Sequence, residues 1–539
     1  MTTIDTRPDA SALHAVDAPD AAGRLVSGVA SWITTADHKR IGRLFIGAAL
    51  LDALAIAVLG VVLGLERIND NSMIDSGALP QLFSLFRATF PFYVVAPLLI
   101  GLAVAVVPLQ LGARSLALPR AALFGFYAWG AGGILVDIAY INNGGPGGGD
   151  SKMVDLWILG LGLTLLGLVA AAGTVVTSVL TTRAPGMTLR RAPLFAWSSL
   201  VGCTGIVLTL PVLLGDLVLI GVDHRYPRAA FGGNEFGSWI AWATTQSATI
   251  VYALAAVGIA AELLVVATGR RAPMRGAIMT GIGLTGAYVL SAVTQREHVI
   301  RWTGRDGAQR FKDVLPYALF YGLPILGFLA VLGGVAFGLK SSKPKPSSPL
   351  VFGMLSLLLM LGAAIAHLLT NVVDLQLQGT VYEEGVFTAV CYSAVLAGLG
   401  GVAYWGPKLW GRSIADKAVL PLGLFGALGT VLASVPMMIA GFQGQPADAV
   451  SGYDYKISPE ILNLLGMVGH AAMGVTILGF VLLAVKSFSS GQPAGDDPWD
   501  GQTLEWATSS PPPPGNFADV PTVSSAEPLL DLKPARSRA

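Results

Sequence analysis

The sequence predicts an all-α integral membrane protein, and three observations lead to that fold class. Hydrophobic residues make up 53% of the 539 residues and charged residues only 12%, whereas a soluble domain carries about 25% charged residues. The mean hydropathy is +0.64, so most of the outer surface has to meet lipid rather than water. The apolar residues form long continuous runs that do not alternate with polar ones, which favours spanning helices over barrel strands.

An apolar run of about 20 residues is long enough to cross the hydrocarbon core of a bilayer as a helix. The sequence contains about twelve such runs, and an even number places both ends of the chain on one side of the membrane. The runs lie near residues 41–65, 83–107, 121–142, 156–180, 193–221, 238–268, 276–296, 314–339, 349–374, 384–406, 417–442 and 458–487.

The basic residues of the loops indicate which side of the membrane holds the termini, because cytoplasmic loops are enriched in Lys and Arg. The loops after even-numbered runs hold most of the basic residues, and we therefore expect both termini in the cytoplasm of a bacterial-type plasma membrane. One loop on the opposite side, 297–313, breaks the pattern with four basic residues. The basic residues that set the orientation are Arg114, Arg120, Arg183, Arg190, Arg191, Arg270, Arg271, Arg275, Lys340, Lys343, Lys345, Lys408, Arg412 and Lys417.

Composition divides the chain into three parts: a polar N-terminal tail at 1–36, a membrane domain at 37–487, and a C-terminal tail at 488–539 that is rich in Pro and Ser. We expect both tails to be extended or disordered. We expect no cleavable signal peptide, because the first forty residues lack a continuous apolar stretch behind a basic start. The formal net charge of +1 gives no reason to expect a nucleic-acid partner.

Six short segments are distinctive enough to compare with known families: Trp32–Gly42, Gly112–Arg120, Pro193–Ser198, Leu208–Leu213, Tyr404–Lys408 and Asp497–Pro513. In their order, and in the number of helices between them, they resemble subunit I of cytochrome c oxidase in the heme-copper oxidase family. The resemblance implies a twelve-transmembrane-helix, subunit I-like bundle. It also implies the lipid bilayer and other membrane subunits, such as those of the subunit II or III type, as partners.

The cofactor ligands of that family are histidines, because a neutral imidazole nitrogen binds heme iron or copper in a low-dielectric site. The resemblance places the low-spin heme ligand of helix II on Phe86, next to Arg87. It places the copper ligands of helices VI and VII on Gln246 and on the pair Ala292 and Val293. The two heme ligands of helix X fall on Val386 and Thr388, and the arginine pair that clamps the heme propionates falls on Ala447 and Asp448.

The chain has only six histidines, and only two of them, His367 and His470, fall well inside predicted spans. Two histidines cannot replace the six ligands that the family uses, so no heme or copper is expected. The alternative is a heme or metal site built on His367 and His470. The favoured interpretation is that both hydrogen-bond between helices.

Charged residues inside predicted spans are costly in lipid and are therefore functional candidates. They are Asp52, Arg87, Asp137, Asp216 and Glu262. Two hypotheses remain open for Arg87: it fills the empty heme cavity and pairs with Asp52 or Glu262, or it snorkels to water from the outer end of its span. A further polar patch, formed by Gln376, Gln378, Glu383 and Glu384, is interpreted as a solvated face at the outer mouth of two helices.

Three functions remain as hypotheses. The favoured one is a non-catalytic paralogue that serves as a structural or assembly component beside respiratory-chain or copper-enzyme membrane subunits. The second is a true terminal oxidase subunit that transfers electrons to oxygen and translocates protons. The third is a transporter or channel that reuses the empty cofactor cavities as a polar path. The fold does not decide among these functions.

Overall fold

The computed structural model describes residues 30–68, 73–75, 78–146, 148–226, 242–244, 247–342, 344, 346–447, 459–520 and 522–533. It divides into two units, Met1–Ala36 and Asp37–Ala539, and the second unit contains every membrane span. The regular structure of the described residues is helical, with three isolated β-bridges and no strand longer than these. The predicted all-α class is confirmed.

Twelve helices in the described residues are long and apolar enough to cross a membrane, as the sequence predicts. Several spans are made of more than one helical segment. In chain order the spans are α2 (His38–Ile68), α3–η2–α4 (Leu79–Gln110), α5 (Pro119–Ile141), α6 (Ser151–Thr181), α7 (Leu194–Arg225), α9 (Ser247–Ala267, within a span that starts at Trp242), α10–α11 (Arg275–Thr294), α12–η4–α13 (Gly307–Ser342), α14 (Ser348–Thr370), α15 (Val381–Trp410), α16 (Asp416–Phe442) and α17 (Pro459–Ser490).

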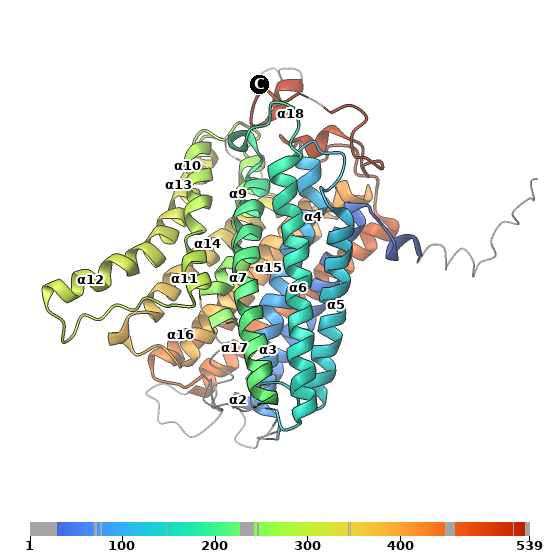
Figure 1. Cartoon of the computed structure of the whole chain (residues 1–539). Helices are drawn as coiled ribbons and strands as arrows, with labels where there is room; N and C mark the ends of the chain where they lie inside the picture. Colours follow the sequence, from blue (N-terminus) through green and yellow to red (C-terminus); the bar gives the residue numbers. More distant parts are fainter. Residues whose placement is uncertain are drawn as a thin grey trace, which may run out of the picture. The chain divides into compact units, whose positions relative to one another are not determined.

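The helices of the second unit run side by side, and their ends define two faces (Figure 1). We call the end where α4 ends and α5 begins the inner end, because the loop charges predict it to be cytoplasmic. The opposite end, where α14 ends and α15 begins, is the outer end. Many large apolar side chains remain exposed along the helices, for example Leu51, Ile134 and Leu482, as expected for a surface that contacts hydrocarbon.

The centre of the bundle is formed by α4, α9 and α15. The most apolar windows of the spans that contain α4 and α15 are completely buried, and that of α9 is 94% buried. Small residues let α2 approach α4 closely, since a Cβ atom on Gly42 would lie 2.5 Å from the carbonyl oxygen of Gly101. Such small-residue contacts drive helix packing in membranes, where apolar burial alone gives no advantage.

Two spans contain a π-helical turn, at Phe90–Val95 (η2) and at Ala318–Gly322 (η4). Pro91 lies inside the first turn, and Pro316 and Pro324 flank the second. A proline has no backbone N–H donor, so it disturbs the regular ladder of helical hydrogen bonds. The second turn separates α13 (Leu323–Ser342) from α12 (Gly307–Tyr317), which projects sideways from the other helices in Figure 1. The predicted span at 314–339 begins inside α12 and leaves out its first turns, because those turns are charged.

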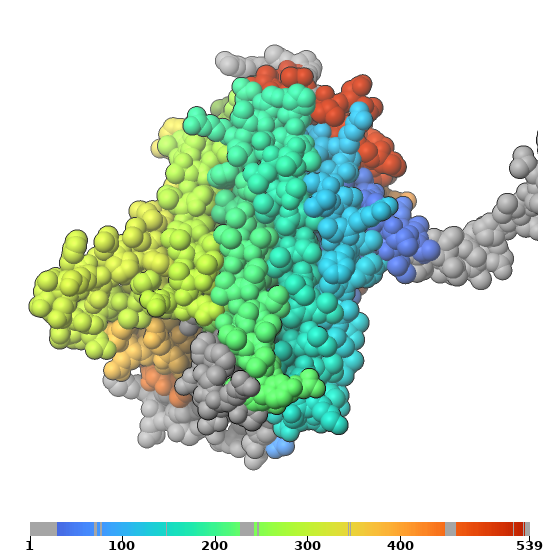
Figure 2. Space-filling model, in the orientation of Figure 1, coloured from blue at the N-terminus to red at the C-terminus, as the bar shows by residue number. Residues whose placement is uncertain are grey.

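The prediction of an extended or disordered C-terminal tail is wrong for the residues described there. The tail contains two short helices, η6 (Leu504–Ala507) and α18 (Pro528–Leu532), and it covers the inner ends of several helices at the top of Figure 2. Leu504, Glu505 and Trp506 are buried. Aromatic and acidic residues that contact helix ends therefore outweigh the Pro and Ser content that predicted disorder. Residues 1–29 of the N-terminal tail lie outside the described residues.

Candidate functional site

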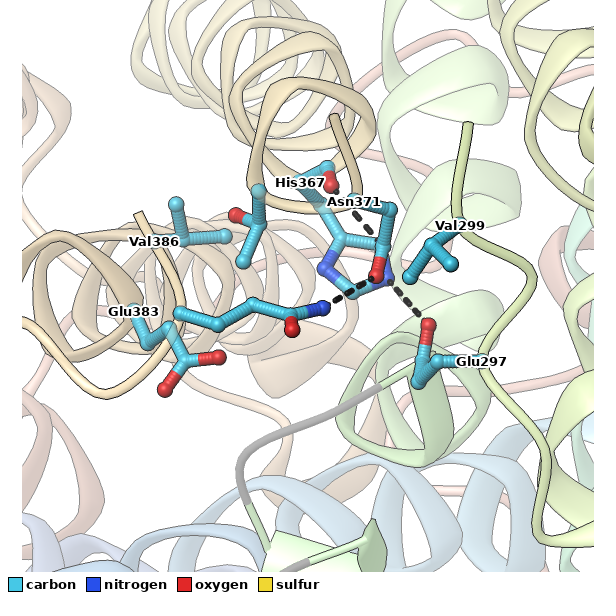
Figure 3. Close-up of a pocket in the computed structure, with 8 residues that line it drawn as sticks. Glu297, Val299, His367, Asn371, Glu383 and Val386 are labelled. Atoms are coloured by element: carbon cyan, nitrogen blue, oxygen red, sulfur yellow. Dashed lines mark hydrogen bonds and ion pairs between the residues drawn. The ribbon is translucent and has the colours of Figure 1, made fainter. Parts of the chain in front are cut away.

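A polar pocket of about 390 Å³ lies near the outer end, between α14, α15 and the segment that follows α11 (Tyr288–Thr294). We call it the outer pocket. Its lining includes His367, Asn371, Glu297, Glu383 and Val386. Figure 3 shows His367 between Val386 on one side and Glu297 on the other. One of the two helix X ligand positions of the resemblance, Val386, therefore borders a hollow.

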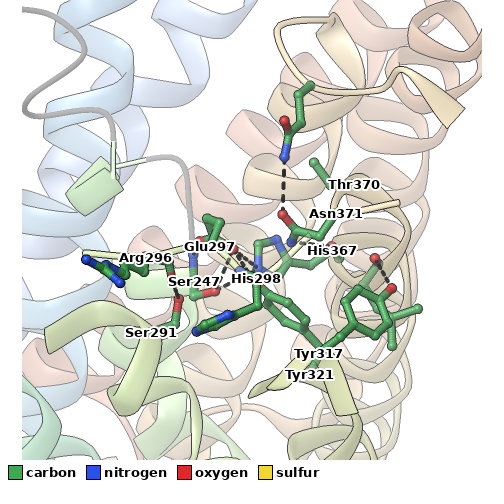
Figure 4. Close-up of polar contacts among 12 residues, drawn as sticks. Ser247, Ser291, Arg296, Glu297, His298, Tyr317, Tyr321, His367, Thr370 and Asn371 are labelled. Carbon is green, nitrogen blue, oxygen red and sulfur yellow. Dashed lines mark hydrogen bonds and ion pairs between the residues drawn. The ribbon is translucent and has the colours of Figure 1, made fainter. Parts of the chain in front are cut away.

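Hydrogen bonds tie the base of the outer pocket to three spans (Figure 4). The side chain of Ser247, at the start of α9, lies 2.9 Å from Nε2 of His367 on α14. Glu297 accepts the backbone N–H of Ser247 at 3.1 Å, the Ser247 hydroxyl at 3.4 Å and the hydroxyl of Tyr321. Tyr321 also accepts the backbone N–H of His298 at 3.1 Å. His367 thus bonds across helices, as the favoured interpretation expects.

These residue types suggest a hydrolytic triad, but their geometry does not. In such a triad the serine and the acid bond to opposite nitrogens of the imidazole ring. Here Ser247 and Glu297 both approach Nε2 of His367, at 2.9 and 3.9 Å. In the described part of the chain, no group of three or more His, Cys, Asp or Glu side chains is placed to hold a metal ion. The outer pocket is therefore a polar cavity suited to water or a polar solute.

A second region lies between the spans that resemble helices II and X. Five aromatic or imidazole rings contact one another there, and we call them the aromatic cluster: Phe86, Phe90, Phe387, Tyr392 and His470. The ring centroids of Phe86 lie 5.6 Å from Phe90 and 6.1 Å from Phe387. His470 lies 5.6 Å from Phe86 and 5.5 Å from Tyr392. All these separations fall in the range of direct aromatic packing.

His470 is 4% exposed and satisfies one ring nitrogen inside the aromatic cluster. Its Nδ1 atom lies 2.8 Å from the hydroxyl of Tyr392 on α15, so this histidine also bonds between helices. The space for its ring comes from α2, because a Cβ atom on Gly60 would lie 2.4 Å from the same nitrogen. The other helix X position, Thr388, is also buried.

A buried ion pair joins α2 to α15 at the outer edge of the aromatic cluster. Arg67 donates two hydrogen bonds to Glu384, at 2.9 and 2.7 Å, and a third to the carbonyl oxygen of Ala447 at 3.1 Å. Its guanidinium also lies 4.9 Å from the ring of Phe83. The interpretation of Glu384 as part of a solvated face is wrong, because its side chain is only 5% exposed and is neutralised by Arg67.

The structure corrects the expected partners of Arg87. This residue lies on α3 (Leu79–Thr89), near the outer end, and is half-buried. Glu262 lies near the inner end of α9, where it bonds to Gln110, so about 34 Å of helix separates it from Arg87 at 1.5 Å per residue. Arg87 instead lies close enough to the carboxylate of Glu384 to interact with it electrostatically. The charged neighbour of Asp52 is Asp137.

The remaining sequence candidates are dispersed. Asp216 accepts hydrogen bonds from Trp242 at 3.1 Å and from Gln295 at 2.7 Å. Asp137 is exposed on α5, one turn before its outer end, and Asp52 is half-buried on α2. The helix VII positions are also ordinary helix residues, since Ala292 is buried and Val293 is exposed. Gln246 and Asp448 lie outside the described residues.

Sequence reasoning missed three residues that the structure makes central: Glu297, Arg67 and Glu505. Glu297 and Arg67 stand at the ends of apolar runs, where charged residues are expected and draw no attention. Glu505 stands in the tail segment Asp497–Pro513, which carries part of the resemblance but whose Pro and Ser content predicts disorder. A signal did exist there, because a Leu-Glu-Trp sequence places apolar side chains on both sides of one acid.

Comparison with known proteins gives a consistent result over nearly the whole chain. A family model described as "Cytochrome C and Quinol oxidase polypeptide I" matches residues 40–481. A putative cytochrome c oxidase subunit 1-beta of Streptomyces avermitilis is 28% identical over 95% of this chain and 92% of the relative. A quinol oxidase subunit 1 of Bacillus subtilis is 26% identical over 93% of this chain and 80% of the relative.

Among solved structures, the chain matches a heme-copper terminal oxidase dimer studied by cryo-electron microscopy. The TM-score is 0.60 at 12% sequence identity, and the match covers 84% of each chain. This likeness concerns the fold alone. The twelve spans and the relatives together describe a multi-pass membrane protein.

Proposed function

The chain belongs to the cytochrome c and quinol oxidase polypeptide I family, and from that premise we propose that it is a non-catalytic member. In this proposal it serves as a structural or assembly component of a respiratory or copper-enzyme membrane complex. The observation that carries the proposal is the aromatic cluster. It fills the space between the spans that resemble helices II and X, which is where the resemblance expects a low-spin heme.

The residues of the aromatic cluster do not fit such a heme. A heme needs an open slot between helices and an imidazole nitrogen on its axial sides. Phe86 and Phe387 carry no donor atom, and their rings pack edge to face. His470 supplies the only imidazole in the cluster, and its Nδ1 atom is engaged by Tyr392. Of the copper positions, Ala292 and Val293 have no donor atom either, and Gln246 offers only a weak amide ligand.

A second candidate, transport, is favoured by the outer pocket. A hollow of about 390 Å³ lined by Glu297, Glu383, His367 and Asn371 is large enough for several waters or a small polar solute. In this candidate the pocket is the outer vestibule of a polar path along α9, α14 and α15. The aromatic cluster gives no such path, since its rings are apolar and in contact.

The proposed partners follow from the same family. The exposed apolar side chains of the spans contact the lipid bilayer, and other membrane subunits of the subunit II or III type pack on part of that surface. We propose that both termini face the cytoplasm of a bacterial-type plasma membrane, because the basic loops lie at the inner end.

The main test is a reduced-minus-oxidised absorption spectrum with metal analysis of the chain purified from its native membrane. We expect no heme and no copper at stoichiometric level, although overexpressed protein can trap traces of pigment. One heme per chain that disappears in His367→Ala or His470→Ala would overturn the proposal and support the oxidase hypothesis.

Two further measurements separate the remaining candidates. Affinity purification of the mildly solubilised, tagged chain is expected to recover other oxidase subunits in stoichiometric amount. Proton or ion flux into liposomes that contain the pure chain tests transport. Flux that is abolished by Glu297→Gln, together with no co-purifying subunit, would favour the transport candidate over the structural one.

A further inference from the structure

Two buried carboxyl groups meet at the inner end, one from α9 and one from the C-terminal tail. Glu262 is 3% exposed and Glu505 is fully buried. The side-chain amide of Gln110, the last residue of α4, donates to Oε1 of Glu262 at 2.9 Å and to Oε1 of Glu505 at 3.2 Å. Because both oxygens bond to one nitrogen, they lie no more than about 6 Å apart, the sum of the two bonds.

The surroundings of this pair supply too few hydrogen-bond donors. Glu262 also accepts the backbone N–H of Phe195 at 2.8 Å and the hydroxyl of Thr503 at 3.4 Å. Glu505 also accepts the indole N–H of Trp405 at 3.1 Å. Among the described residues, Oε2 of Glu505 and Oε1 of Gln110 have no partner although both are buried. A buried acceptor without a donor is costly, and a proton on one carboxyl turns an acceptor into a donor.

The cations near the pair are engaged elsewhere. Arg275, on α10, lies on the Glu262 side and forms an ion pair with Glu527 at 3.3 Å. Lys408, on α15, donates to the carbonyl oxygens of Asp496 and Thr508 at 2.8 and 2.6 Å.

The other titratable groups that face the pair come from α15 and from the tail. Tyr404, on α15, accepts the indole N–H of Trp506 at 2.7 Å. Lys533 pairs with Asp497 at 2.6 Å. Within the described ranges, no ion pair involves Glu262 or Glu505, so their mutual repulsion is not cancelled by a direct cation.

The geometry points to a proton-binding site in which Glu262 and Glu505 together hold one proton, and in which that proton allows the C-terminal tail to dock on the inner end. Two carboxylates in so dry and close an arrangement cannot both be ionised, and they titrate as a pair. A small cavity lined by Glu262, Arg275, Thr503 and Glu527 adjoins the pair and has room for about one water, near 10 Å³. The shared proton can exchange with solvent through this small cavity.

The site makes docking of the tail depend on pH. Burial raises the pKa of the Glu505 carboxyl above its ordinary value of 4.5. The docked state of the tail therefore binds more protons than the undocked state, and docking is strongest in acid. Docking weakens as the pH rises from about 4.5, the ordinary pKa of a glutamate, to the raised pKa of Glu505 in the docked state. For one proton, the docked-to-undocked ratio changes by up to about tenfold per pH unit within that window.

Infrared spectroscopy of the purified full-length chain tests the site directly. A neutral carboxyl has a C=O stretching band that an ionised one lacks. At about pH 7 we expect wild type to show one more neutral carboxyl than Glu505→Gln and also one more than Glu262→Gln, because either change removes the repulsion. The matched control is Asp531→Asn, which removes an exposed carboxylate of the same tail that pairs with Arg271 and is expected to keep the band. Identical carboxyl bands in wild type and both variants would overturn the proposal.

A labelling experiment tests the link to docking. Val523→Cys places a thiol at a buried tail position, and Ser509→Cys places one at an exposed position of the same tail. The ratio of their maleimide labelling rates cancels the reactivity of the thiol itself. We expect the labelling rate at position 523, divided by the rate at position 509, to rise several-fold between about pH 6 and about pH 9. The same ratio is expected to stay constant when Glu505→Gln is added to both variants. A ratio that rises equally with Glu505→Gln rules the pair out as its cause.

Discussion

The aromatic cluster and the outer pocket occupy neighbouring ground, and α15 contributes to both. Phe387 packs in the cluster, whereas Val386, one residue earlier, borders the pocket. On one side five rings are in contact. On the other side a hollow of about 390 Å³ is lined by Glu297, His367 and Asn371. Phe86 and Val386, two positions to which the resemblance assigns heme ligands, thus meet opposite environments.

Under the proposal that this chain is non-catalytic, the difference teaches that replacing a ligand does not by itself determine whether the space around it is filled or left open. Large rings close a space by direct contact, and an apolar void that remained would be costly. Polar side chains can leave a space open, because water then satisfies them. In the proposal that this chain is non-catalytic, one half of the cofactor region became a packed core and the other half became a wet cavity.

The largest effect is expected at the ion pair that closes the aromatic cluster. Arg67→Ala leaves the carboxylate of Glu384 buried without its cation, and removing one partner of a buried pair costs roughly 3–5 kcal/mol. A thermal melt of the detergent-solubilised protein measures this. The matched control is the double variant Arg67→Met with Glu384→Leu, which removes both charges and is expected to recover most of the loss. Equal melts for Arg67→Ala and wild type contradict the buried pair.

Phe86→Ala tests whether the aromatic cluster is a packed core. Truncation of a fully buried ring costs roughly 3–5 kcal/mol, and here about 3 kcal/mol is expected because Phe90 and Phe387 can move partly into the gap. Val386→Ala is the comparison on the pocket side, where the lost methyl groups already face a hollow, and about 1 kcal/mol is expected. Similar melting temperatures for the two variants would remove the contrast between cluster and pocket.

The fold was accessible from the sequence because hydrocarbon imposes long apolar runs that composition reveals. The contrast between cluster and pocket was not accessible, because it depends on which side of α15 each residue faces. Phe86 was identified as a changed position, but its contact with His470 joins residues from two distant spans. Arg67 and Glu384 are 317 positions apart, and no local pattern pairs them.

The prediction for the C-terminal tail was wrong for a different reason. Its Pro and Ser content predicts an extended chain, yet Leu504 and Trp506 are buried at the inner end. Contacts with helix ends supply the apolar partners that the tail lacks within itself. Composition measures only what a segment can bury alone, so it cannot detect docking onto a preformed surface.

A third pair of variants compares the two histidines. Tyr392→Phe removes the hydroxyl from Nδ1 of His470 inside the cluster, where water has no room, so about 1–3 kcal/mol is expected. Ser247→Ala removes the hydroxyl from Nε2 of His367 beside the outer pocket, where water can replace it, and about 0.5–1 kcal/mol is expected. Melts measure both changes. A larger loss for Ser247→Ala than for Tyr392→Phe would mean that the outer pocket is dry.

The smallest effect is expected for Arg87→Ala, and it separates the two arginines that face Glu384. Arg87 acts on Glu384 as a neighbouring charge and is half-buried near the outer end, whereas Arg67 donates two short hydrogen bonds to the same carboxylate. Partly solvated charge interactions contribute about 0.2–1 kcal/mol, so the melt is expected to shift by a fraction of the Arg67→Ala shift. The shift also decreases in high salt, because exposed charges are screened, while that of Arg67→Ala does not. An Arg87→Ala loss as large as that of Arg67→Ala would restore the hypothesis that Arg87 fills the former heme cavity.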